Sequence, residues 1–361
     1  MNPDARNILL CLHYGIGDLI TELPAIQRLR EVVPRATITA LGAKPATEIL
    51  DGDRRVDRVV SIQRWGIQHL GDPADEQVHR RFGDWLKANQ FDLILDPSHA
   101  ATVVRRAIYD SDIPIGDSDG ACLEAGLAQG MDGLSAVKNA MRLGWGMDVP
   151  ASYNPTLDLR PDEIAWARRF LEQQGTTEHL VGLSPGASDD LKRWPVMQFG
   201  RLCRDLAGEL DARVLLMVGS QEIDLLSELQ DEIDALGLEI VVNLHLRQVA
   251  ALLSLCRLYV GNDSGLMHLA AAVRTPVVVF FGPTVPRLYL PRWIRSRAIV
   301  SPMACPYRLS RNFGHPPCIL AHKCLLGTPC IDAIDPQQAV AAVQQEFLAA
   351  RKDQHREVGV P

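Results

Sequence analysis

Short apolar runs alternate along the whole chain with longer segments in which apolar residues recur every three or four positions. This alternation is typical of a parallel β-sheet covered by helices, because buried parallel strands are apolar on both faces. The strands that the pattern predicts are NILLCLH, ATITAL, VDRVVSI, FDLILD and IPIG in the first half, and HLVGLSPG, ARVLLMVG, LEIVV, RLYVG and PVVVFFG in the second half.

The segment GMDVPASYNPTLDLRPDE separates the two groups of strands, and its three prolines and lack of period predict a domain boundary. We therefore predict an α/β protein of two Rossmann-like, doubly wound domains, residues 1–155 and 156–334, followed by a helix and tail over 335–361. The last helix should begin after IDPQQ and run to about Ala350. Ligands bind at the carboxyl ends of such strands, so the polar corners should face a central cleft.

The composition excludes several classes of protein but does not indicate a particular function. The chain has 361 residues, of which 47% are hydrophobic and 22% charged, as in globular proteins. The net charge of −7 argues against non-specific nucleic-acid binding. The chain start lacks the features of a signal peptide, and no apolar run approaches the roughly 18 residues that span a bilayer. We expect a cytoplasmic protein without a nucleic-acid partner.

The corner after RLYVG carries the first candidate site. Asn-Asp-Ser-Gly leads into a helix expected to start near Leu266, and backbone N–H groups at a helix start attract anions. Gly265 would let a phosphate approach the backbone. His268 falls on the first turn. The alternative is structural, with Asp263 or Ser264 capping the helix.

Two further corners of the second half have a similar composition. SPGASDDLKRWP supplies small residues, among them Ser188, and the cation of Lys192. VGSQEID places Glu222 where an acid often holds ribose hydroxyls. A solvated lysine and an acid at a helix start are the plain alternatives. Taken together, the three corners point to a nucleotide diphosphate.

In the first half, HYGIGDLITELPAI has a turn at Gly15 and Gly17, with a helix expected from about Glu22. Leu19, Ile20 and Thr21 interrupt the dinucleotide fingerprint G-x-G-x-x-G, which disfavours a Rossmann dinucleotide site. Asp18 is presented at the strand end. It is either a general base or the cap of a helix that begins near Leu19.

The chain resembles the glycosyltransferase family that contains the lipopolysaccharide heptosyltransferases. The motifs GNDSGLMHLAAAVRTPVVVFFGPT, GIGDLITELPAIQRLREVVP and DDLKRWP carry the resemblance. It implies a GT-B fold, ADP-heptose as donor and inversion at the anomeric carbon, with no cofactor and no metal required. It also implies that Asp18 and Lys192 are catalytic. The donor site that it implies comprises Glu222, Leu244, Asp263, Gly265, Leu266 and His268, and the composition of the corners adds Ser188 and Ser264.

Some features depart from the family or stay open. His13 and Tyr14 precede the glycine corner where the family often has Ser or Arg. Residues 64–85 and 110–133 match nothing specific, so the acceptor, whether a glycan, a glycolipid or a protein, is left open. No D-x-D metal motif occurs in a suitable place. Competing functions are transfer from another nucleotide sugar, a GT-B-fold nucleotide-sugar epimerase and a non-catalytic binding module.

Two segments keep alternative interpretations. RLYLPRWIRSR, residues 287–297, could meet an anionic acceptor or the inner face of the membrane, or could be a solvated basic edge. Cys305, Cys318, Cys324 and Cys330 crowd one loop without a C-x-x-C pair. They are either reduced thiols or a structural metal site. The oligomeric state is not indicated.

Overall fold

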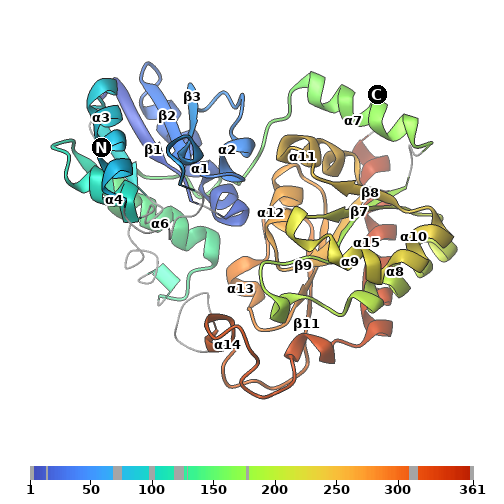
Figure 1. Cartoon of the computed structure of the whole chain (residues 1–361). Coiled ribbons are helices and arrows are strands. Elements are labelled where there is room, and N and C mark those ends of the chain that lie inside the picture. The colour runs from blue at the N-terminus through green and yellow to red at the C-terminus, as the bar shows by residue number, and fades with distance from the viewer. Residues whose placement is uncertain are drawn as a thin grey trace. The chain divides into compact units, whose positions relative to one another are not determined.

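The chain consists of two compact units, residues 1–156 and residues 157–361, in the computed structural model (Figure 1). Each unit is described by itself below. The residues that the structure describes are 4–13, 15–67, 75–96, 102–117, 126–127, 129–175, 179–308 and 316–357. No helix within these ranges is long and apolar enough to cross a bilayer.

Unit 1 is built on a five-stranded parallel sheet with the order β3-β2-β1-β4-β5. Its strands are β1 (Asn7–Cys11), β2 (Thr37–Gly42), β3 (Arg58–Ser61), β4 (Leu93–Asp96) and β5 (Ile115–Asp117). The chain winds outward from β1 in one direction and then from β4 in the other. The sheet therefore has a topological switch point between β1 and β4.

Helices cover the unit 1 sheet. Alternate residues of each strand point to opposite faces, so both faces of this parallel sheet carry side chains that the helices bury. The helices are α1 (Ile16–Val32), α2 (Ala46–Ile49), α3 (Glu76–Asn89), α4 (Thr102–Tyr109) and α6 (Gly133–Trp145). Leu9 of β1 and Ile94 of β4 share one core with Phe82 of α3 and Ile108 of α4. The helices α3 and α4 lie side by side in Figure 1, and α1 contacts α6.

Unit 2 is built on a six-stranded parallel sheet with the order β11-β10-β9-β6-β7-β8. Its strands are β6 (Leu180–Ser184), β7 (Arg213–Val218), β8 (Glu239–Val242), β9 (Leu258–Asn262), β10 (Val277–Phe281) and β11 (Ser296–Val300). Here the switch point lies between β6 and β9, because the chain winds outward from β6 first and then from β9.

The helices of unit 2 cover its sheet in the same way (Figure 1). They are α7 (Pro161–Gln173), α8 (Val196–Leu210), α9 (Asp224–Glu228), α10 (Gln230–Leu236), α11 (Leu246–Leu255), α12 (Gly265–Ala272), α13 (Pro286–Tyr289), α14 (Pro317–Leu320) and α15 (Pro336–Glu357). On one face, Phe199 of α8 and Phe347 of α15 pack against Val260 and Phe280 of the sheet. α11 and α12 contact each other.

The ten predicted strands and the two doubly wound sheets are confirmed, whereas three details are wrong. The first helix begins at Ile16 rather than near Glu22, and it contains Pro24. The strand β11 follows the basic segment and was not predicted, because it lacks an apolar run. The last helix begins at Pro336 and ends at Glu357, seven positions beyond the expected Ala350.

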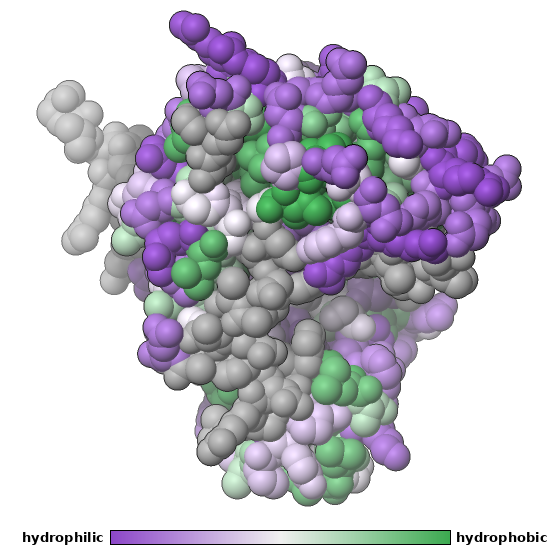
Figure 2. Space-filling view, turned by 90° about the vertical axis from the view of Figure 1, so that its left-hand side faces the viewer, coloured by the Kyte–Doolittle hydropathy of each residue, from purple (hydrophilic) through white to green (hydrophobic). Residues whose placement is uncertain are grey.

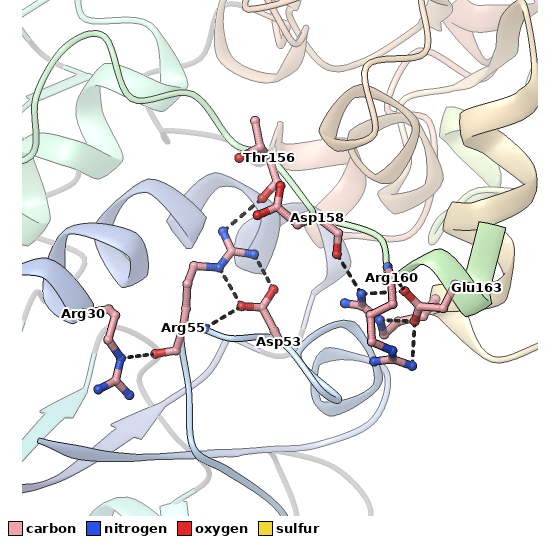
Figure 3. Close-up of polar contacts among 8 residues, drawn as sticks. Arg30, Asp53, Arg55, Thr156, Asp158, Arg160 and Glu163 are labelled. Carbon is pink, nitrogen blue, oxygen red and sulfur yellow. Dashed lines mark hydrogen bonds and ion pairs between the residues drawn. The ribbon is translucent and has the colours of Figure 1, made fainter. Parts of the chain in front are cut away.

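The segment that joins the units is anchored on both sides by buried arginines (Figure 3). Arg55 pairs with Asp53 at 2.6 Å and donates to the carbonyl of Thr156 at 3.0 Å. Arg247 pairs with Glu163 at 2.5 Å and donates to the carbonyl of Asp158 at 2.8 Å. Each carbonyl is therefore bound to an ion pair within its own unit.

Candidate functional site

Three corners of unit 2 meet at the carboxyl end of its sheet, because β6 lies between β7 and β9. Ser184, the last residue of β6, pairs with Gly261 of β9. The loop after β6 therefore lies beside the loop after β9, at the switch point where open parallel sheets bind ligands.

Asn262 fastens two of these loops together. Its side chain is fully buried, and its amide nitrogen donates to the carbonyl of Pro185 at 2.7 Å. Its amide oxygen accepts from the N–H of Trp194 at 3.0 Å. A buried amide with its donor and its acceptor both satisfied gives rigidity. The candidate list from sequence omitted Asn262, although it stands in the quoted motif Gly-Asn-Asp-Ser-Gly.

Lys192 and Asp263 form an ion pair between these loops. Lys192 Nζ lies 3.3 Å from Asp263 Oδ2, and the side chains are 13% and 5% exposed. Thr284, which follows β10, donates its hydroxyl to the same oxygen at 2.7 Å. The Lys192 ammonium also lies 5.7 Å from the ring centre of Tyr289. Lys192 is therefore fixed by its neighbours, and the alternative of a solvated lysine is wrong. Asp263 binds the side chains of Lys192 and Thr284 rather than capping a helix.

Glu222 lies directly against the backbone of Gly186. A Cβ atom at Gly186 would overlap the Glu222 carboxylate, so any larger residue would displace this side chain. Glu222 also accepts from the N–H of Gly219 at 3.2 Å. It ends a short 3₁₀ helix, Ser220–Glu222, that follows β7. The acid predicted beside a ribose is thus brought to the corner after β6.

The start of α12 is open in the sense that no side chain caps its backbone N–H groups. Ser264 occupies the N-cap position, but its side chain makes no cap hydrogen bond there. Ser264, Gly265 and Leu266 are half-buried, at the positive end of the helix dipole. The structural alternative, in which Asp263 or Ser264 caps this helix, is therefore wrong.

The other predicted donor residues lie at different depths in unit 2. His268 is 7% exposed, and its ring stacks on that of Trp293 with the centres 6.3 Å apart. Ser188 is exposed in the loop after β6. Leu244 is half-buried in the loop between β8 and α11. The strand β8 pairs with β7, and Glu222 lies just after β7. The predicted corners thus lie at strand ends, and the stacking of His268 on an indole was not indicated by the sequence.

In unit 1, Asp18 is exposed on the first turn of α1. The N-cap of this helix is Gly15, so the interpretation of Asp18 as the cap is wrong. The Asp18 carboxylate folds back over Gly15, where any Cβ atom would overlap it. His13, just after β1, pairs with the buried Glu22 of α1. Sequence reasoning noted His13 only as a departure and missed its partner.

The four cysteines of the loop differ in burial, since Cys305 and Cys324 are only partly buried. Cys318 and Cys330 are buried, and burial raises the pKa of both thiols, with Cys305 adding to the rise. Cys324 Sγ donates to the carbonyl of Thr328 at 2.9 Å. No group of three or more His, Cys, Asp or Glu within the described ranges is arranged to hold a metal ion.

The basic segment, whose last two residues begin β11, is an ion-paired edge. Arg295 Nε lies 2.7 Å from Glu346 of α15, and Arg297 lies 3.6 Å from the same carboxylate. Arg297 also donates to Gln345 at 2.8 Å. These contacts favour the interpretation of this segment as a solvated basic edge.

The sequence is similar to those of known proteins. The family described as glycosyltransferase family 9 (heptosyltransferase) matches residues 135–311. Lipooligosaccharide heptosyltransferase 2 of Haemophilus ducreyi is 32% identical over 164 residues, which cover 42% of this chain and 46% of that protein. Lipopolysaccharide heptosyltransferase 1 of Salmonella typhimurium is 26% identical over 301 residues, covering 78% of this chain and 90% of that protein.

The fold is shared more widely than the sequence. The structure of the E. coli ADP-heptose lipopolysaccharide heptosyltransferase II superposes with a TM-score of 0.69 at 19% identity, covering 96% of this chain and 99% of that one. By contrast, the sequence match spans less than half the length of the heptosyltransferase 2 relatives. The chain is therefore related to the heptosyltransferases of glycosyltransferase family 9, through the sequence of residues 135–311 and through the GT-B fold of its two parallel-sheet units.

Proposed function

We propose that the protein is an inverting glycosyltransferase that moves heptose from ADP-heptose to a hydroxyl of a lipopolysaccharide-type acceptor. The observation that carries the proposal is the convergence of three loops at the β6–β9 switch point of unit 2. There Lys192 is held as a cation beside the open start of α12. A cation and a helix start together suit a diphosphate.

The donor binds to unit 2 in this proposal. The pyrophosphate lies against Gly265 and Leu266, with Lys192 beside its oxygens, and Glu222 accepts from ribose hydroxyls. Leu244 packs on adenine, while His268 and Ser188 line the sugar and the phosphates. As the bond from the anomeric carbon to the diphosphate oxygen breaks, the electron pair leaves with ADP. Fixed donors stabilise this developing charge without reorganisation.

The acceptor is activated on unit 1 in this proposal. Asp18 takes the proton of the acceptor hydroxyl while that oxygen bonds to the anomeric carbon. Attack opposite the leaving ADP inverts the configuration at this carbon, as in inverting glycoside chemistry. No metal or cofactor takes part in these steps, since Lys192 and the helix start meet the leaving charge.

Calorimetry followed by transfer assays tests this function. ADP should bind more tightly than GDP or UDP, and ADP-heptose should be consumed only when a heptose-deficient lipopolysaccharide core is added. Preference for another nucleotide would move the assignment to a different donor sugar. Conversion of the nucleotide sugar without any acceptor would favour the epimerase.

Contact with a membrane surface is a further part of the proposal. Leu320, Leu325 and Leu326 are 61%, 39% and 49% exposed in the segment around α14, with Lys323 exposed between them. Hydrophobic groups lie near the lower edge of Figure 2, at the height of α14 in Figure 1. Exposed leucines around a lysine suit an anionic bilayer. Flotation with anionic vesicles should carry the protein, and replacing the three leucines with serine should abolish this.

A further inference from the structure

The switch point of unit 1 holds a cluster of charged side chains. His13 follows β1 by two residues, and Asp96 is the fully buried last residue of β4, the strand next to β1. Asp18 and Glu22 lie one turn apart on α1, so they share a face of the helix. The imidazole thus contacts one of these carboxylates, Glu22, and lies in the electrostatic field of the other two.

The imidazole is bound firmly by one of the three carboxylates. His13 Nδ1 contacts Glu22 Oε1, and the side chains are 29% and 2% exposed. The negative charges of Asp18 and Asp96 act on the same ring. Cys11 of β1 also faces this cluster, but burial raises the pKa of its thiol well above the ordinary value, so it stays neutral.

Two carboxylates one turn apart on the same face of a helix, as Asp18 and Glu22 are, repel each other, and a nearby cation offsets the repulsion. Asp18 is the exposed member and has the most freedom to turn. Its carboxylate nevertheless lies folded over Gly15, two residues from His13. The positive imidazole, which contacts Glu22 one turn along the helix, offsets the repulsion between the two carboxylates and favours this position.

We propose that His13, held by Glu22, is a positioning residue that keeps the ionised Asp18 carboxylate in its place over Gly15. The inference rests on the proposed function only in so far as Asp18 is the base. It adds a residue pair that the family resemblance does not supply, because the family often has Ser or Arg before this corner.

The charge state of His13 supports this role. Burial lowers the pKa of the imidazole, but Glu22 outweighs burial and, with Asp18 and Asp96, raises it from 6.5 to about 9. Burial raises the pKa of the Glu22 carboxyl, and His13 opposes that rise. The imidazolium is therefore present at neutral pH and is lost as the pH rises through about 9.

The test combines imidazole titration by NMR with rates of transfer against pH. The His13 resonance should titrate near pH 9 in the wild-type chain, and near or below 6.5 in Glu22→Gln. It should also shift downward in Asp18→Asn. The control Glu232→Gln removes another buried carboxylate, one that pairs with Arg204 in unit 2, and should leave the resonance unchanged.

In the rate profiles, the alkaline limb should lie near pH 9 for the wild type and move to lower pH in Glu22→Gln. His13→Gln should lower kcat by roughly 10²-fold, the scale of a misplaced reacting group, with little change in KM for the donor. His13→Lys keeps the cation and should recover most of the loss, moving the limb above pH 9.

The proposal would be overturned if the His13 resonance titrated near 6.5 in the wild type and did not shift in Asp18→Asn. An alkaline limb that stays in the same place in Glu22→Gln would overturn it as well. Melting temperature and ADP affinity are measured in each variant, and the titrations of Glu22→Gln and Asp18→Asn decide the matter even where His13→Gln unfolds. Absence of transfer by the wild-type chain would refute the proposed function alone, because the titration needs no substrate.

Discussion

The switch points of the two sheets have the same topology and opposite chemistry. At the end of β1 and β4, one imidazole contacts the carboxylate of Glu22 and lies in the field of Asp18 and Asp96. At the end of β6 and β9, backbone groups and the cation of Lys192 surround an open helix start. One arrangement suits the uptake of a proton and the other suits a bound anion. The fold fixes where each site lies, and a few side chains decide its charge.

The largest effect is expected from removing the proton acceptor of the unit 1 site. Asp18→Asn keeps the size of the side chain but cannot take a proton, so turnover should fall roughly 10²–10⁴-fold. ADP affinity and melting temperature should stay unchanged, since the nucleotide is assigned to unit 2. The exposed Asp84→Asn on α3 is the control. Turnover near that of the wild type would remove Asp18 from the mechanism.

Removing the cation of the unit 2 site should have the next largest effect. Lys192→Ala should raise the barrier to transfer by about 2–4 kcal/mol, the scale for one donor to a developing anion. Unlike Asp18→Asn, it should also weaken ADP binding in calorimetry. Lys87→Ala, at an exposed lysine of α3 that belongs to neither site, provides the control. Equal ADP affinity in both variants would argue against a diphosphate beside Lys192.

A smaller effect should follow from adding one methyl group. Gly186→Ala would displace the Glu222 carboxylate, at a cost of about 1–3 kcal/mol in stability or ADP affinity. Gly208→Ala on α8 meets open space and should be neutral or slightly stabilising. If Gly186→Ala bound ADP as the wild type does, Glu222 would have no place in nucleotide binding.

The smallest effect on transfer is expected from an ion pair that belongs to neither site. Burial raises the pKa of Glu163, but Arg247 and Arg160 outweigh it and lower the pKa below 4.5. The stabilisation is therefore complete above pH 4.5 and is lost as the pH falls through the lowered pKa. Melting curves between about pH 7 and pH 3 should show this loss in the wild type and less of it in Glu163→Gln. Parallel curves would contradict it.

The strands could be predicted from sequence because buried parallel strands are continuous apolar runs. The strand β11 escaped because it is half-buried at the sheet edge, where Ser296 and Arg297 interrupt the pattern. The start of α1 escaped for a different reason, since Gly15, Gly17 and Pro24 are residues that usually end helices.

The corners of the site were predictable, whereas their neighbours were not. Polar residues after apolar runs mark strand ends, which is how Asp18, Lys192 and Asp263 were found. Strand order decides which ends meet, and sequence alone does not reveal that β6 lies beside β9. The pairs His13–Glu22 and Asn262–Trp194 depend on that order and on side-chain direction, so they emerge only from the structure.

The anchored crossing between the units has a consequence for limited digestion. A protease draws a stretch of several free residues into its cleft before it cuts, and domain boundaries usually supply one. Here the carbonyls of Thr156 and Asp158 are bound by Arg55 and Arg247, and the N–H of Leu157 donates to Ala272. Trypsin or subtilisin should therefore spare this crossing in the native protein, and releasing the two halves as separate fragments will require first removing one of the two arginines.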